Sequence, residues 1–253
     1  MFAKERQEMI AAQVKTRGRV VVNELARQFE ITEDCIRKDL TVLAKQGLVK
    51  KTYGGAIAVR ENPHLYSSNE RKAIESPERE VIADKAVSLI KPGMRVYLDC
   101  SVTSIAVSER LVSKQIHVTV ITNMISVLNV LTLSKETDLI FIGGSLNPEH
   151  DAFTGTAAQM QLSKYQTDLA LIGAVGINAE ESKIYTYRED DGLMKETAIS
   201  NAKKSYVLAE SGKFSQEAEY IFARPEDITG FISSDQLDES IRATLNNSGL
   251  EVL

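Results

Sequence analysis

The sequence predicts an α/β protein in which a small helical domain precedes a larger domain of alternating strands and helices. Two patterns point to this organisation. Up to residue 58, apolar residues recur at helical spacing in three short segments, and a basic ribbon follows them. From residue 78 onward, short apolar strands alternate with helical segments, which is typical of a mainly parallel sheet covered on both faces. At 253 residues, the chain is long enough for each domain to bury a core of its own.

The N-terminal domain, residues 1–58, has the pattern of a helix-turn-helix. An opening helix is predicted over residues 4–16 and a second over residues 23–29. Thr32 is a good N-cap for a third helix, and Gly47 is a natural end for it. The apolar residues of the third helix lie at i, i+4 and i+7, so they form one buried stripe. The residues expected to be buried in the three helices are Ile10, Val14, Leu25, Ala26, Phe29, Ile36, Leu40 and Leu43.

A basic ribbon, residues 48–56, follows the third helix. It combines strand-forming residues with two adjacent lysines and a tyrosine, and its turn contains two glycines. Such a ribbon is typical of a wing that lies beside a DNA backbone. The N-terminal domain is therefore expected to be a winged helix-turn-helix.

Charge and geometry favour double-stranded DNA as the partner of this domain. Residues 1–58 carry 11 basic and 7 acidic side chains, a net charge of +4, whereas residues 59–253 carry −9. A basic domain on an acidic body confines the attraction for nucleic acid to one end, which the net charge of −5 of the whole chain would not indicate. The N-terminal turns of a helix in the major groove come closest to the bases, and arginine can form a bidentate pair with guanine. The predicted DNA contacts are Thr32, Cys35, Arg37, Lys38 and Thr41 on the third helix, and Lys50, Lys51, Tyr53, Gly54 and Gly55 on the ribbon, where the lysines would meet phosphates.

Residues 59–77 are polar and irregular, with two prolines, and are interpreted as a linker. The second domain is expected over residues 78–253. It is predicted to open with a helix near residues 80–90, which ends before a Pro-Gly pair. Strands are predicted at residues 95–99, 117–122, 138–142, 169–172, 205–208 and 230–232, with helical segments between them.

Polar residues and glycines stand where several of these strands end. The first strand runs into residues 99–104, which include an aspartate, two serines and a threonine, before a helix begins. Thr122-Asn123 ends the second strand and Gly143-Gly144 the third. Ligands of parallel sheets bind at the carboxyl ends of the strands, and the free amides at a helix start can hold a phosphate. The sequence therefore predicts a small-molecule site at this edge.

The chain resembles the DeoR family of bacterial transcriptional regulators. In that family the recognition helix usually carries Thr-Ile-Arg-Arg-Asp-Leu, and a Gly-Gly-Ala wing follows. Here the first motif reads Cys-Ile-Arg-Lys-Asp-Leu over residues 35–40, and Gly-Gly-Ala stands at residues 54–56. Lys38 replaces a planar guanidinium by a point charge, which is expected to shift base preference without abolishing binding.

The second domain resembles the effector domain of the same family, whose fold is similar to that of ribose-5-phosphate isomerase, glucosamine-6-phosphate deaminase and CoA transferases. The resemblance implies that a phosphorylated sugar or a related metabolite controls DNA affinity. This chain departs from the family motifs by having Ser101 for a glycine, Val102 for a hydroxyl residue, Asp191 for a glutamate and Glu210 for an aspartate. The ligand is therefore expected to differ from the family norm, or to be bound by hydroxyls of the 101–104 segment. The effector-binding residues expected on this basis are Asp99, Ser101, Thr103, Ser104, Thr122, Asn123, Gly143, Gly144, Lys195, Glu210 and Lys213.

We interpret the sequence as that of a cytoplasmic repressor of a carbohydrate transport or catabolism operon, expected to act as a homodimer or homotetramer on operator DNA. No run is apolar for long enough to cross a bilayer, and no secretory signal pattern is visible. The sequence suggests no cofactor, catalytic residue or metal ligand: His64, His117 and His150 lack metal-ligand spacing, and Cys35 and Cys100 are expected to be reduced thiols.

Two alternatives come from other classes. The larger domain could be a sugar-phosphate isomerase or deaminase with an attached DNA-binding domain, using groups such as Asp99 and Glu210 as acid and base. This would require an acid–base pair on the motifs, and no histidine stands on any of them. The small domain could instead bind another protein, but its charge of +4 argues for nucleic acid.

Overall fold

The computed structural model describes residues 3–17, 19–46, 48–52, 54–58 and 75–253, without the side chains of residues 15–17, 19, 50, 57 and 58. The chain divides into two compact units, an N-terminal unit of residues 1–65 and a C-terminal unit of residues 66–253. Gly47, Tyr53 and residues 59–74 of the expected linker lie outside the described residues.

The N-terminal unit is a winged helix-turn-helix, as the sequence predicts. Its elements are α1 (Ala3–Arg17), β1 (Arg19–Val21), α2 (Val22–Phe29), α3 (Glu33–Lys45), β2 (Val49–Thr52) and β3 (Gly55–Ala58). The strands form an antiparallel sheet in the order β1-β3-β2. Of the residues expected inside, Ala26 and Phe29 are partly buried and the others are buried, so the predicted helical faces are confirmed.

The recognition helix α3 is held by a cap at its N-terminus and by hydrogen bonds from α1. Thr32 is its N-cap, and the Thr32 hydroxyl accepts a long hydrogen bond of 3.4 Å from the N–H of Cys35. Within α3, Asp39 is buried, and its carboxylate accepts hydrogen bonds of 2.7 Å from both Arg6 and Gln7 of α1. A buried carboxylate needs such partners. The pair therefore sets α3 against α1.

The C-terminal unit is built on one parallel sheet in the order β15-β14-β12-β9-β4-β5-β6. Its strands are β4 (Arg95–Leu98), β5 (Val118–Thr122), β6 (Thr137–Phe141), β9 (Thr167–Gly173), β12 (Ala202–Leu208), β14 (Gly230–Ile232) and β15 (Glu251–Val252). All six strands predicted from the sequence belong to this sheet. The two-residue edge strand β15 was not predicted.

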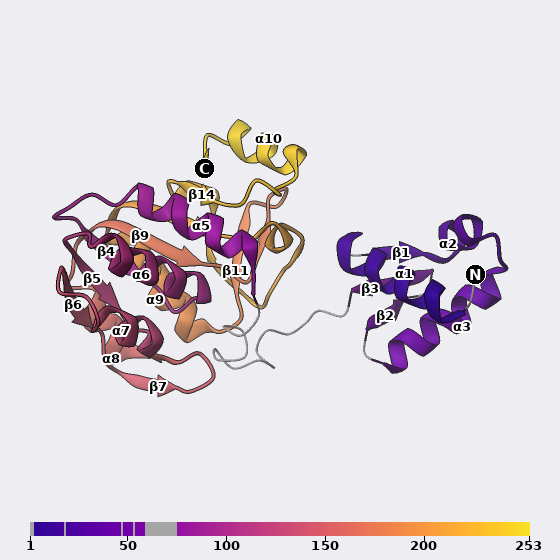
Figure 1. Ribbon diagram of the computed structural model, residues 1–253, viewed down its shortest axis with the longest axis horizontal. Helices are drawn as coiled ribbons and strands as arrows, with labels where there is room; N and C mark the ends of the chain where they lie inside the picture. Colours follow the sequence, from indigo (N-terminus) through magenta and orange to yellow (C-terminus); the bar gives the residue numbers. More distant parts are fainter. Residues whose placement is uncertain (1–2, 18, 47, 53, 59–74) are drawn as a thin grey trace. The chain divides into compact units, whose positions relative to one another are not determined.

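Helices cover both faces of the sheet (Figure 1). One core contains residues of α5 (Pro77–Ser88), α6 (Val102–Lys114) and α7 (Ile125–Leu131), and the other contains residues of α8 (Thr156–Leu162), α9 (Glu189–Ser200) and α10 (Glu239–Asn247). Successive residues of a strand point to opposite faces. Val96 and Leu98 of β4 accordingly join the first core and Tyr97 the second. The helix α5 begins at Pro77 with Ser76 as its N-cap, three residues before the helix that the sequence predicts near residues 80–90.

Short elements surround the carboxyl edge of the sheet. The strands β10 (Gly176–Asn178), β11 (Lys183–Thr186) and β13 (Tyr220–Ala223) form an antiparallel sheet, and β7 (Ser145–Asn147) pairs with β8 (Ala152–Thr154). The 3₁₀ turn η2 (Ser211–Ser215) follows β12, and the 3₁₀ turn η3 (Pro225–Asp227) precedes β14. None of these elements was predicted. No helix among the described residues is long and apolar enough to span a membrane.

Candidate nucleic-acid interface and effector site

The first turns of α3 present the side chains that were predicted to reach DNA bases. Thr32, Cys35, Arg37 and Lys38 are all exposed. The Arg37 guanidinium donates to the carboxylate of Glu33 at 3.2 Å, and both side chains are about half exposed, at 49% and 51%. An exposed pair at i, i+4 contributes only about 0.3–0.5 kcal/mol. Arg37 can therefore exchange Glu33 for a base at little cost.

The wing is tied to the recognition helix by one short chain of hydrogen bonds. Lys51 Nζ donates to Thr41 Oγ1 at 2.8 Å, and Thr41 Oγ1 donates to the carbonyl of Arg37 at 2.7 Å. Lys50 lies on β2, with its side chain outside the described atoms, and Tyr53 is not described. Gly54 is exposed at the turn between β2 and β3.

Gly55 has a packing role that the sequence did not indicate. It is buried, and a Cβ atom at this position would lie 1.9 Å from the carbonyl oxygen of Val20. Only glycine allows β3 to approach β1 so closely. The structure thus explains this residue without a DNA contact.

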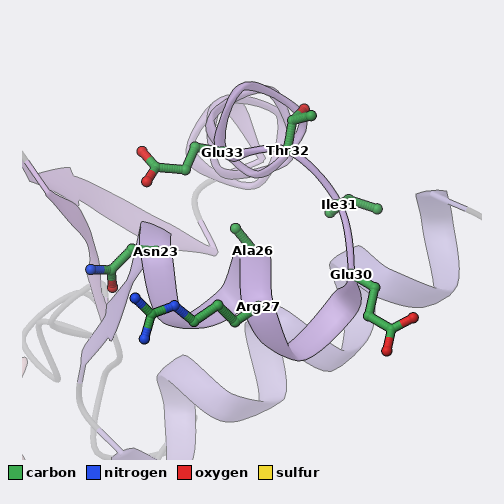
Figure 2. Close-up of a pocket in the computed structure, with 7 residues that line it drawn as sticks. All are labelled: Asn23, Ala26, Arg27, Glu30, Ile31, Thr32 and Glu33. Carbon is green, nitrogen blue, oxygen red and sulfur yellow. The ribbon is translucent and has the colours of Figure 1, made fainter.

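An open hollow of about 510 Å³ lies between α2 and the start of α3 (Figure 2). Figure 2 shows the polar ends of Asn23, Arg27 and Glu33 at one side of the hollow, with the Glu30 carboxylate at the other. Sequence reasoning assigned no role to Asn23 or Arg27. Their spacing of four residues on α2 places both on one helix face, beside the recognition helix. The hollow is lined by Asn23, Ala26, Arg27, Glu30, Ile31, Thr32 and Glu33.

In the C-terminal unit, Asp99 is the centre of a buried polar cluster at the carboxyl edge of the sheet. Its side chain is 1% exposed. Its Oδ1 accepts from Ser104 Oγ at 2.9 Å, while Oδ2 accepts from the N–H of Gly173 at 2.8 Å and pairs with the Lys195 ammonium. A buried carboxylate needs such partners, and here each oxygen has at least one.

Lys195 and Asp191 come from successive turns of α9 and complete the charged cluster. Lys195 Nζ lies 3.4 Å from Asp191 Oδ2. Asp191 also accepts hydrogen bonds from the Cys100 thiol at 2.9 Å and from the Thr186 hydroxyl at 2.6 Å. Two carboxylates thus face one ammonium in the interior. The cluster joins the end of β4, the first turn of α6 and the ends of β9 and β11 to α9.

Burial and attraction act in opposite directions on these groups. Burial alone would raise the pKa of Asp191, but the ammonium of Lys195 and the hydrogen bonds from Cys100 and Thr186 outweigh it, so that pKa is lowered. Burial would lower the pKa of Lys195, but Asp191 and Asp99 raise it above its ordinary value. For Cys100, burial and the nearby Asp191 raise the pKa well above the usual range. The thiol is therefore protonated and acts as a donor.

Ser101 closes the space in which a glycine would leave the backbone open. It is the N-cap of α6, its hydroxyl accepts from the N–H of Ser104 at 3.2 Å, and the two hydroxyl oxygens lie 2.8 Å apart. A Cβ atom on Gly173 would lie 2.4 Å from the Cβ of Ser101. Thr103 is buried in the first turn of the same helix. The hydroxyls of Ser101 and Ser104 therefore already bond to each other.

The polar and glycine residues at the ends of β5 and β6 lie at the same carboxyl edge of the sheet, but each bonds to partners outside the charged cluster. Thr122 Oγ1 accepts from the N–H of Met124 at 3.2 Å. Asn123 accepts from the hydroxyl of Tyr97 at 3.1 Å and donates to the carbonyl of Phe153 at 2.8 Å. The N–H of Gly143 donates to Gln161 at 3.0 Å.

Glycine at position 144 is required by packing. A Cβ atom there would lie 2.7 Å from the carbonyl oxygen of Thr154 and 2.9 Å from the Cβ of Ala158, and φ is +156°. The Gly-Gly pair therefore brings the end of β6 close to the start of α8.

The remaining two predicted residues follow β12. Glu210 accepts from the hydroxyl of Ser76 at 2.8 Å and pairs with Arg79 at 3.4 Å, so it is held by the start of α5. Lys213 lies in η2. The structure therefore brings Asp99, Ser101, Ser104 and Lys195 together in one cluster and engages Glu210 elsewhere.

Thr186, which sequence reasoning missed, belongs to the cluster. It ends the short strand β11, and nothing in its sequence neighbourhood singles it out. No group of three or more His, Cys, Asp or Glu side chains suited to a metal ion occurs in the part of the chain that the structure describes.

Comparison with known proteins identifies both units. Residues 6–62 match the DeoR-like helix-turn-helix domain, and residues 74–235 match the DeoR C terminal sensor domain. The chain belongs to the DeoR family. The resemblance seen in the sequence is thus confirmed, and the buried polar cluster lies within the DeoR sensor domain.

Several DeoR-family relatives match this chain over most of their length. The HTH-type transcriptional repressor GlcR of Bacillus subtilis is 32% identical, over 100% of this chain and 96% of that protein. A putative aga operon transcriptional repressor of Escherichia coli O157:H7 is 30% identical, over 98% and 93%. The glycerol-3-phosphate regulon repressor of E. coli K12 is 28% identical, over 85% and 84%.

One solved structure is similar to this chain in fold at low sequence identity. The tetrameric eIF2B-beta2-delta2 complex from C. thermophilum matches with a TM-score of 0.53 and 12% identity, over 97% of this chain and 88% of that chain.

Proposed function

We propose that this protein is a DNA-binding repressor of an operon for carbohydrate transport or breakdown, and that a phosphorylated sugar or a related metabolite controls its DNA affinity. The observation that carries the proposal is the pairing of two units in one chain. One exposes Arg37 and Lys38 on a recognition helix, and the other holds a buried charged cluster in a DeoR sensor domain. Relatives of this chain bear the names of repressors, one of them of a glycerol-3-phosphate regulon.

The DNA contacts follow from the placement of side chains around α3. This helix would lie in the major groove, with Arg37 paired to a guanine and Lys38 nearby. The first helix of such a motif crosses the DNA backbone. Arg27 and Asn23 on α2 are therefore proposed to meet phosphates, as are Lys50 and Lys51 on the wing.

Effector control would act at the carboxyl edge of the parallel sheet. Sugar hydroxyls can bond to carboxylates and ammonium groups such as those of Asp99 and Lys195. A ligand that binds one arrangement of this cluster better than another shifts the population between DNA-binding and non-binding states. Homodimers or homotetramers are proposed because paired half-sites strengthen a modest single-domain affinity.

The hydrogen bonds that Asp99 and Glu210 make favour a transcriptional regulator over a sugar-phosphate isomerase. An acid–base role needs a carboxyl group that can reach a substrate proton. Both Asp99 oxygens are engaged by Ser104, Gly173 and Lys195, and Glu210 is engaged by the start of α5. These contacts argue against an acid–base role for Asp99 and Glu210.

The test is a fluorescence-anisotropy titration of the full-length chain against duplex DNA from upstream of its own gene, at fixed salt, with and without a panel of sugar phosphates. We expect tight binding that one compound changes. If the protein binds the DNA but no sugar phosphate alters the binding, the proposed DNA-binding role stands and the tested compounds are excluded as effectors. Binding no tighter than to a random duplex would count against that operator, and a further search with a random duplex library would then decide the DNA-binding role.

A further inference from the structure

The start of α5 and the turn η2 cap each other through exchanged carboxylates. Glu210, the N-cap residue of η2, accepts from the hydroxyl of Ser76, which is the N-cap residue of α5. In the other direction, Glu78 of α5 accepts from the N–H of Ser211 at 2.8 Å and from its hydroxyl at 2.9 Å. Each carboxylate thus lies at the N-terminus of the other segment, where a negative charge is favourable.

Further contacts make this junction more than a surface pair. Arg79 pairs with Glu210 at 3.4 Å, with side chains only 14% and 28% exposed. Glu78 also accepts from the hydroxyl of Ser234, which is buried after β14. Partly buried charges that lose a partner are costly, so the two sets of contacts favour forming or breaking together.

The junction lies between two functional parts of the chain. On one side, Leu208 at the end of β12 pairs with Gly173, whose N–H bonds to Asp99 of the buried cluster. Lys213, an expected effector contact, lies inside η2 itself. On the other side, α5 is the first described helix after residues 59–74, which join it in sequence to the DNA-binding unit.

We propose that these exchanged caps couple the effector cluster to DNA binding, with Glu78 and Glu210 as the positioning residues. The inference rests on the proposed function. A ligand that draws on Lys213 or the end of β12 moves η2, and the caps then break. Ser76 and Arg79 then lose their acceptor, Glu210, and Glu78 loses its donor Ser211. This changes the start of α5, which follows the connection to the DNA-binding unit in sequence.

Thermodynamic linkage allows a test in which no effector needs to be known. If the caps respond to the effector and alter DNA binding, DNA binding must bias the same caps. The probe is a duplex that the wild-type chain selects from a random library. Hydrogen exchange of the full-length chain is measured by mass spectrometry with and without saturating duplex, in peptides covering residues 75–82 and 209–216.

In the wild type, we expect DNA to change the exchange rate in both peptides by about fivefold or more, the lower end of typical allosteric coupling. Glu78→Gln should still bind the duplex but should lose this change. The matched control is Glu80→Gln, the same substitution two residues along α5, where the carboxylate pairs with Arg110 instead. That variant should keep the wild-type response.

If Glu78→Gln does not fold, Ser76→Ala removes the other cap without a charge change and should give the same loss. Exchange at both peptides that DNA leaves unchanged in the wild type would overturn the coupling while the DNA-binding role stands. So would an equal response in Glu78→Gln and Glu80→Gln. If the wild type selects no duplex at all, the proposed function fails, and the coupling fails with it.

Discussion

The Asp99 carboxylate accepts a 2.8 Å hydrogen bond from the backbone N–H of Gly173, which joins the ends of the neighbouring strands β4 and β9 through a side chain. Ser101 lies directly over the same glycine. The site thus requires a residue at 173 that offers its N–H and carries no Cβ. Ser101 and Gly173 form one packing unit, which makes the pair open to a direct test.

Gly173→Ala should destabilise the C-terminal unit by about 1–3 kcal/mol, because the new Cβ would lie 2.4 Å from that of Ser101. Ser101→Gly alone should cost only a few tenths of a kcal/mol as an N-cap change. The double variant should recover most of the loss, since the obstructing atom is gone. Urea unfolding of the four proteins measures the coupling; strictly additive effects would contradict this packing relationship.

The buried charges predict how the stability of the C-terminal unit depends on pH. The pKa of Asp191 is lowered in the folded state, against the effect of burial, by Lys195 and by hydrogen bonds from Cys100 and Thr186. Its contribution is therefore complete above its unfolded pKa of about 3.9 and is lost as the pH falls through the folded value. Asp191→Asn should flatten the acid side of the curve of unfolding free energy against pH. Asp138→Asn, at an exposed position on β6, should leave that curve as in the wild type.

The buried pair between Asp39 and Arg6 predicts a stability effect confined to the N-terminal unit. Asp39→Ala leaves Arg6, which is 13% exposed, without its carboxylate and should cost about 3–5 kcal/mol. Calorimetry should show the transition of the N-terminal unit at a lower temperature, with that of the C-terminal unit unchanged. Asp34→Ala removes an exposed carboxylate from the first turn of the same helix and should cost well under half as much.

The main sheet could be predicted from the sequence because its longer strands are runs of buried apolar residues between helical segments. The strands β7, β8, β10, β11 and β13 are short and lie outside this run of strands and helices, and β11 pairs with the distant β13, so no repeating pattern marks them. Thr186 could not be predicted for the same reason, because its place in the site depends on the strand β11.

Contacts between distant residues set a second limit on prediction. The family motifs named both Asp99 and Lys195, yet the two are 96 residues apart, and only the fold shows that they form an ion pair. For Glu210, the motif and the structure indicate different surroundings. Its motif indicated the effector site, whereas its longer side chain reaches the start of α5.

Lys51→Ala should weaken binding to all DNA sequences to a similar extent. Its ammonium is held by Thr41 at the wing, where it would meet a phosphate rather than a base. Loss of one phosphate contact should reduce the slope of log affinity against log salt by about 1. Anisotropy titrations at several salt concentrations measure this slope. Lys4→Ala, which removes the same charge from an exposed position on α1, should change the slope less; equal slopes for the two variants would exclude a phosphate role for Lys51.

Arg37→Ala should weaken binding to the preferred duplex by about 1–3 kcal/mol and relax base preference at one position. The exposed pair with Glu33 contributes little to folding, so the loss reports on DNA rather than on stability. Arg37→Lys keeps the charge but lacks the planar fork, and it should therefore lose most of the discrimination while binding random DNA normally. Titrations of both variants against the preferred and a random duplex measure the two effects. Equal losses on the two duplexes would show that Arg37 contacts the backbone and reads no base.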